Sequence, residues 1–173
     1  MEKEYDKLLE KDFITQLKGR IRKLTPEELK EKIIKFLMDN KICTLATCSR
    51  NIPRSTPVRY RSRGLTIYIL SEGGGKVKNI IENPQVSLSI VGEYSGFQSV
   101  TGLQIWGRAE IIKPGDGQRY QEAKTVINLE EREDLRKMKI QNVRDMYIIK
   151  IETERARYLS FPEGILNQVV TLI

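Results

Sequence analysis

The sequence has 173 residues, with 30 basic and 23 acidic side chains and no histidine. The absence of histidine excludes Ser-His-Asp and Cys-His catalysis within this chain, and it excludes zinc or haem sites that use histidine ligands. Any proton transfer must therefore use carboxylates, lysine, tyrosine, water or a cofactor.

The first predicted element is a helical extension over residues 1–24, in which apolar residues recur with a period of about 3.6 between positions 5 and 22. We expect this extension to pack on the rest of the chain or on a partner chain. A second helix begins after Thr25, because Thr25 and Glu28 have the spacing of a capping box and Pro26 suits the first helical position. The sequence Asp39-Asn40 ends this helix.

Short strands follow one another through most of the remaining sequence. Strands are predicted at 41–48, 54–62, 65–71, 86–90, 103–112, 145–152 and 156–161, with helices at 76–82 and 118–138. Consecutive strands exclude a doubly wound parallel sheet and favour a small antiparallel barrel with peripheral helices, which is a mainly β, α+β fold. We therefore predict one domain over residues 25–162, between the N-terminal extension 1–24 and an apolar C-terminal tail, 163–173.

The cysteines and the apolar runs indicate a cytoplasmic protein. Cys43 and Cys48 lie five positions apart on one predicted strand, so they point to opposite faces and are poorly placed to form a disulfide. Two thiols without histidine are a poor metal site, and we predict no bound metal. The first fifteen residues lack the apolar region of a signal peptide, and no run reaches the roughly 18 apolar residues of a membrane span. We therefore expect both cysteines to be buried thiols in a reducing compartment, and we expect the protein to make no contact with a membrane.

The net positive charge is concentrated in one stretch. Residues 41–90 hold eight basic and two acidic side chains, and so carry six of the seven net charges. A local excess of this kind predicts an anionic ligand. The alternative is that these are solvated charges, which often protect strand edges from pairing.

A glycine-rich loop lies within this basic stretch. The sequence Ser71-Glu-Gly-Gly-Gly-Lys76 connects a predicted strand to a predicted helix. Successive glycines let backbone amides converge, and the helix N-terminus and Lys76 both favour an anion. The loop is not a P-loop, because Val77 stands where a serine or threonine would hold magnesium. A flexible connection is the alternative, but the neighbouring arginine-bearing strand at 54–61 favours a phosphate.

The order of these segments resembles that of the FMN-binding split-barrel proteins related to pyridoxamine 5′-phosphate oxidase. The resemblance extends over roughly residues 26–160. Its most specific part is Lys-Val-Lys-Asn-Ile-Ile-Glu-Asn-Pro-Gln-Val-Ser-Leu at 76–88, followed by Gly-Arg-Ala-Glu at 107–110. The resemblance implies a six-stranded antiparallel split barrel, a homodimer, and FMN bound at the interface between the two chains.

The resemblance also implies positions for the cofactor site. The family's strand around the flavin falls on Thr56, Pro57, Val58, Arg59 and Arg61, and the contacts of the next strand fall on Tyr68 and Ile69. The family's phosphate-binding Ser-Arg-Lys falls on Gly74, Gly75 and Lys76, so the lysine is retained and the arginine is missing. We expect Arg59 or Arg61 to supply that charge. Trp106 is expected either at the flavin ring or in the core or dimer interface, and no catalytic acid or base is predicted.

The departures from the family bear on activity. True pyridoxamine-phosphate oxidases carry a C-terminal motif with tryptophan, arginine and histidine that grips the substrate, and this chain does not match it. The leading hypothesis is an FMN-dependent oxidoreductase with an unknown small-molecule substrate, because the flavin itself performs the redox step. The alternatives are a deazaflavin cofactor, haem (disfavoured without histidine), or a non-enzymatic dimer that stores or senses flavin. Nucleic-acid binding is the weakest, because no pair of base-stacking aromatics accompanies the arginines.

Overall fold

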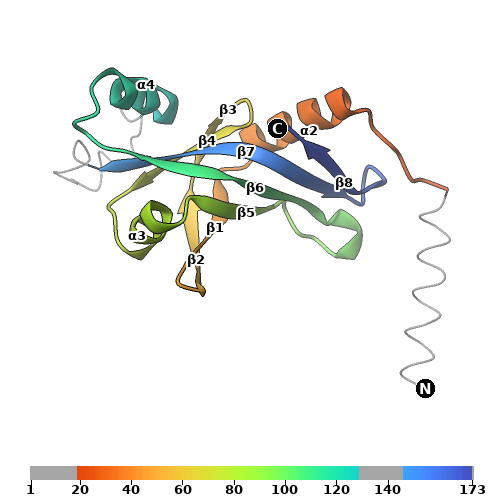
Figure 1. Cartoon of the computed structure of the whole chain (residues 1–173). Helices are drawn as coiled ribbons and strands as arrows, with labels where there is room; N and C mark the ends of the chain where they lie inside the picture. The colour runs from red at the N-terminus through yellow and green to blue at the C-terminus, as the bar shows by residue number, and fades with distance from the viewer. Residues whose placement is uncertain (1–18, 129–145, 173) are drawn as a thin grey trace.

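The computed structural model describes residues 19–128 and 146–172, which form one curled sheet with helices around it (Figure 1). The helices are α2 (Pro26–Asp39), α3 (Gly75–Glu82) and α4 (Gln118–Ile127), with a short 3-10 turn, η1 (Phe97–Ser99). The strands are β1 (Ile42–Ser49), β2 (Ile52–Arg59), β3 (Arg61–Arg63), β4 (Thr66–Ser71), β5 (Gln85–Val91), β6 (Thr101–Ile112), β7 (Tyr147–Ser160) and β8 (Ile165–Thr171).

The two end strands of the curled sheet belong to one continuous segment of the chain. Its strand order is β2-β1-β5-β6-β7-β4-β3, with β8 paired to β7, and all neighbouring strands are antiparallel. The terminal strands β2 and β3 are separated only by Tyr60, which is buried. The Tyr60 N–H donates to the Lys41 carbonyl at 2.9 Å, and its hydroxyl donates to the Leu37 carbonyl at 3.1 Å. The predicted split-barrel fold is therefore confirmed.

The strand boundaries differ from the predicted ones at three places, and the sheet has eight strands, compared with seven predicted strands and the six-stranded barrel that the resemblance implies. The predicted strand 54–62 is divided at Tyr60 into β2 and β3. The predicted strands 145–152 and 156–161 form one strand, β7, because a bulge absorbs the irregularity between them without breaking the pairing to β6. Within the segment predicted as a C-terminal tail, residues 165–171 form β8.

The second predicted helix corresponds to α2, and it begins after Thr25 as expected. The Thr25 side chain accepts a hydrogen bond from the Glu28 N–H, and the Glu28 carboxylate accepts one from the Thr25 N–H. This hydrogen bonding holds the pKa of Glu28 below its ordinary value. Residues 1–18 of the predicted extension and residues 129–138 of the predicted helix 118–138 lie outside the described residues. Within the described part, that helix ends at Asn128, which has a left-handed φ of 53°.

The core lies inside the barrel, and a second apolar cluster lies outside it under α4. The inner core takes alternate residues of the strands together with the apolar face of α2, as represented by Ile33, Leu45, Leu88 and Ile105. The outer cluster brings residues of α4 against β4, β6 and β7; its buried members are Tyr68, Ile112, Tyr120, Ala123, Ile127 and Ile148. This second cluster includes Tyr68, which is one of the residues predicted to contact the cofactor.

The two cysteines differ in their surroundings, as the alternation along β1 predicts. Cys43 is buried in the core and Cys48 is half-buried, and both are free thiols. Burial raises the pKa of Cys43 to about 12. Since the thiolate is the reactive form, the Cys43 thiol is neutral and inert at ordinary pH.

This difference predicts the thiol chemistry of the folded protein. At about pH 8, a colorimetric disulfide reagent should react with Cys48 in the folded protein and reach Cys43 only after denaturation. Cys48→Ser should abolish the reaction of the folded protein, and Cys43→Ser should leave it in place. Rapid reaction of both thiols in the native protein would be inconsistent with a buried Cys43.

Candidate functional site

The glycine-rich loop forms the entry to α3. Gly73 and Gly74 have positive φ values of 108° and 80°, which a glycine adopts without a steric penalty. The Gly73 N–H donates to the buried Ser71 hydroxyl at 3.1 Å, and the Lys76 ammonium donates to the Gly73 carbonyl at 3.3 Å. The first turn of α3 contains no acidic side chain. The loop therefore places a lysine beside the positive end of a helix dipole.

An arginine from β2 lies against this loop. A Cβ atom added to Gly75 would stand 2.7 Å from the Nε atom of Arg54 and 2.8 Å from its Cζ atom. The Arg54 guanidinium therefore occupies the space that any other residue at position 75 would fill. It does so at the position where the family resemblance implies an arginine.

Hydrogen bonds between β1 and α3 fix the position of the loop relative to β2. The Asn79 side-chain amide donates to the Thr47 hydroxyl at 3.1 Å, and the Ser49 hydroxyl donates to the Asn79 Oδ1 atom at 3.1 Å. Thr47 is paired with Arg54 across the β1–β2 register, so the two side chains share one face of the sheet. The end of β1 thus holds Arg54 on the side of the sheet that α3 covers.

A cavity lies beside Arg54. It has a volume of about 360 Å³ and is lined by residues of the β1–β2 hairpin and α3, namely Ser49, Arg50, Ile52, Pro53, Arg54, Ser55 and Asn79. In the part of the chain that the structure describes, neither Arg54 nor Lys76 forms an ion pair with a carboxylate. The two cations at the helix N-terminus are thus available to an anion, and their chemistry fits a phosphate.

Arg59 and Arg61, which were expected to supply the missing arginine charge, do not lie on the same face of one strand as Arg54. Successive residues of a strand point to opposite faces, so Arg54, Thr56 and Val58 lie on one face of β2 and Pro57 and Arg59 lie on the other. Arg61 lies in β3, where it pairs with Tyr68. Arg54 is the arginine placed against the glycine loop, and the sequence reasoning missed it. The glycine at position 75 was the available signal.

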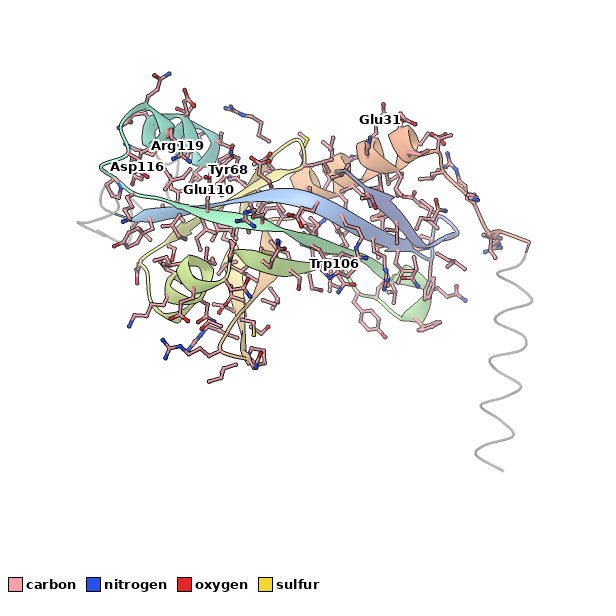
Figure 2. The ribbon with its side chains drawn as sticks, in the orientation of Figure 1. Glu31, Tyr68, Trp106, Glu110, Asp116 and Arg119 are labelled. Atoms are coloured by element: carbon pink, nitrogen blue, oxygen red, sulfur yellow. The ribbon has the colours of Figure 1, made fainter. Side chains whose placement is uncertain are left out.

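The predicted contacts from β4 are buried in the protein. Ile69 is fully buried in the barrel core, and Tyr68, on the opposite face, is only 8% exposed under α4. Figure 2 shows Tyr68 together with Glu110 and Arg119, which form an ion pair at 2.8 Å. Both side chains pack against other parts of the protein, and the contact of Tyr68 and Ile69 with a cofactor stays a prediction.

Trp106 lies on the outer face of the sheet and not in the barrel core. It is half-buried on β6, between Ser87 on β5 and Arg155 on β7 (Figure 2). The Arg155 guanidinium carbon lies 4.0 Å from the centre of the indole ring, and that of Arg157 lies 5.5 Å from it. Trp106 is therefore not a core residue, and the flavin ring and the dimer interface stay as its predicted locations.

The described residues also contain a second cavity, but no cluster of metal ligands and no helix that could span a membrane. A larger cavity, of about 550 Å³, lies between α2 and β7 and includes none of the predicted site residues. Within residues 19–128 and 146–172, no group of three or more His, Cys, Asp or Glu side chains is arranged to hold a metal ion. None of the described helices has the length and apolar character needed to cross a membrane.

The curled antiparallel sheet and its connectivity define the split-barrel class. The family model described as pyridoxamine 5′-phosphate oxidase matches residues 29–160. The chain belongs to this family. No curated protein matches it.

Solved structures share the fold. The chain is similar to a FAD-binding protein from Mesorhizobium loti, with a TM-score of 0.59 and 21% identity over 73% of this chain and 90% of that one. It is similar to General Stress Protein 26 from Bacillus anthracis, with a TM-score of 0.61 and 20% identity over 83% and 98% of the two chains. A heme binding protein from Mycobacterium smegmatis has a TM-score of 0.61 and 16% identity, over 88% of this chain and 59% of that protein.

Proposed function

We propose that this chain is an FMN-binding flavoprotein that acts as an oxidoreductase on a small molecule. The observation that carries the proposal is the position of the Arg54 guanidinium against Gly75, beside Lys76 and the N-terminus of α3. This is a donor set for a phosphate monoester, because two cations and a helix N-terminus converge there. The FAD-binding protein of the same fold supports a flavin as the ligand class.

In this proposal, the residues of the chain bind and orient the cofactor. Arg54 and Lys76 hold the phosphate, and the bound flavin supplies the redox chemistry by accepting and donating a hydride. The chain needs no histidine for this reaction. No side chain is assigned as a catalytic acid or base.

We also propose that the protein is a cytoplasmic homodimer that binds neither nucleic acid nor membrane. Short side chains support the outer face of β1 as the surface that a second copy covers; they are Thr44 and Ala46. Short side chains allow the close approach of another sheet. Analytical ultracentrifugation should give twice the chain mass, and a monomer in the presence of FMN would contradict this part.

Reconstitution tests the cofactor proposal. Flavin-free protein mixed with FMN should retain a visible flavin spectrum after gel filtration, and dithionite should bleach it. A protein that refuses FMN but takes up a deazaflavin would replace FMN with that cofactor. A protein that retains neither would refute the proposal. A protein that holds FMN but transfers no electrons from it to added acceptors after reduction would instead be a flavin-storage or sensing protein.

A further inference from the structure

We propose that Arg155, Arg157 and Trp106 form a recognition site for a small planar anion, an aromatic carboxylate or phosphate. This inference goes beyond the proposed function, and the binding can be measured without flavin. The site lies on the outer face of β6 and β7, on a different face of the sheet from Arg54 and α3.

A β-bulge builds this site. Trp106 pairs with Arg155 and the next residue of β6, Gly107, pairs with Thr153, so Glu154 is an extra residue on β7. A Cβ atom on Gly107 would overlap the Glu152 carbonyl oxygen, so the two strands approach too closely for any other residue there. Bulges re-aim side chains and are frequent beside functional sites. Here the bulge sets Trp106 and Arg155 opposite each other.

The two arginines stack on one indole ring. Both guanidinium carbons lie within 5.5 Å of the Trp106 ring centre. Arg155 and Arg157 are two residues apart on one strand and therefore share a face. Cation–π contact holds a guanidinium by its plane and leaves the N–H donors at its edge for other partners. A carboxylate or phosphate matches that edge, because it accepts two parallel hydrogen bonds from a guanidinium.

No carboxylate compensates these two charges in the part of the chain that the structure describes. Arg155 and Arg157 form no ion pair there, and neither does Glu154, the acid beside them in sequence. Glu152 is paired with Lys150 at 2.6 Å. The hydrogen bond from Lys150 holds the pKa of Glu152 below its ordinary value, so this carboxylate is ionised and already paired. Two adjacent cations without an acid favour an anionic ligand.

The neighbouring side chains suit a planar group. In the β5–β6–β7 register, Ser87 is opposite Trp106, Ser89 is opposite Gln104, and Gln104 is opposite Arg157. Short hydroxyl side chains leave room above β5, and the Gln104 amide adds a hydrogen-bond donor and acceptor. An aromatic ring beside the indole with its acidic group toward the arginines would use all of these groups.

Trp106 is the only tryptophan in the sequence, so its fluorescence reports on this site directly. Flavin-free protein should be titrated with benzoate, phenyl phosphate and neutral benzamide. Benzoate or phenyl phosphate should change the Trp106 emission saturably, and the stronger of the two identifies the acidic group. Benzamide should bind about tenfold more weakly or not at all, because it lacks the charge. Equal binding of benzamide, or no saturable change with either anion, would overturn the inference.

A pair of double variants separates local contacts from overall charge. Arg155→Gln with Arg157→Gln should weaken anion binding by about tenfold or more, while Trp106 remains as the reporter. Arg63→Gln with Lys113→Gln removes the same charge from exposed residues elsewhere and should leave binding unchanged. Equal weakening in both would show a long-range charge effect and refute the site. Circular dichroism melting curves verify that each variant is folded.

The result is independent of cofactor binding. FMN uptake is read from the visible flavin spectrum, and anion binding is read from Trp106 in protein without flavin. Anion binding without FMN uptake would refute the proposed function and retain the site. FMN uptake without anion binding would refute the site and retain the function.

Discussion

Replacing Arg54 or Lys76 with glutamine should each weaken FMN binding by about 1.5–3 kcal/mol, which is roughly 10–150-fold in the dissociation constant. The reason is that each variant removes a charge-assisted hydrogen bond to a phosphate at the N-terminus of α3. Arg54 should matter as much as Lys76, because its guanidinium lies against the Gly75 backbone. Isothermal titration calorimetry of flavin-free protein with FMN measures both effects.

Lys78 provides the matched control for these variants. It is an exposed residue of the same helix, two positions after Lys76, and Lys78→Gln removes the same charge. Its effect on FMN affinity should be small, since charge without contact is screened by solvent. If Arg54→Gln bound FMN as tightly as Lys78→Gln, Arg54 would have no part in the site.

Gly107→Ala should destabilise the fold by about 1–3 kcal/mol, because the added Cβ atom overlaps a backbone carbonyl that cannot move independently of β7. The affected pairing is the bulged junction of β6 and β7, the two longest strands of the sheet. Urea denaturation measures the free energy of unfolding. The emission of Trp106, the adjacent residue, should shift in the same variant.

Gly115→Ala is the comparison for this substitution. No atom lies within 4 Å of a Cβ atom at Gly115, and its φ is not positive. This variant should be nearly as stable as the native chain. Equal stability of the two alanine variants would mean that the β6–β7 bulge has room to adjust, and it would weaken the argument that the bulge positions Trp106.

Local sequence signals predicted the elements whose structure is determined locally. The Thr25–Glu28 capping box and the break after Asp39 define α2, and both depend on residues within one helical turn. Alternation of apolar and polar residues predicted β5, and the five-residue spacing of Cys43 and Cys48 predicted their different surroundings on β1. The antiparallel barrel followed from short consecutive strands, and the observed sheet bears this out.

The features that were missed depend on contacts between residues far apart in the sequence. β7 was predicted as two strands, because the bulge that joins them is defined by Gly107 on another strand. Arg54 on β2 lies against Gly75 at the start of α3, and the only sequence signal for this contact was the glycine at position 75. The packing of α4, some fifty residues later in the chain, against Tyr68 was likewise not predicted.

The most direct test of the phosphate site compares two ligands that differ only by that group. Flavin-free protein should be titrated with FMN and with riboflavin under identical buffer conditions. FMN should bind at least about tenfold more tightly than riboflavin, and the difference should be lost when both Arg54 and Lys76 are replaced by glutamine. Equal affinity of the native protein for FMN and riboflavin would contradict a phosphate site at Arg54, Gly75 and Lys76.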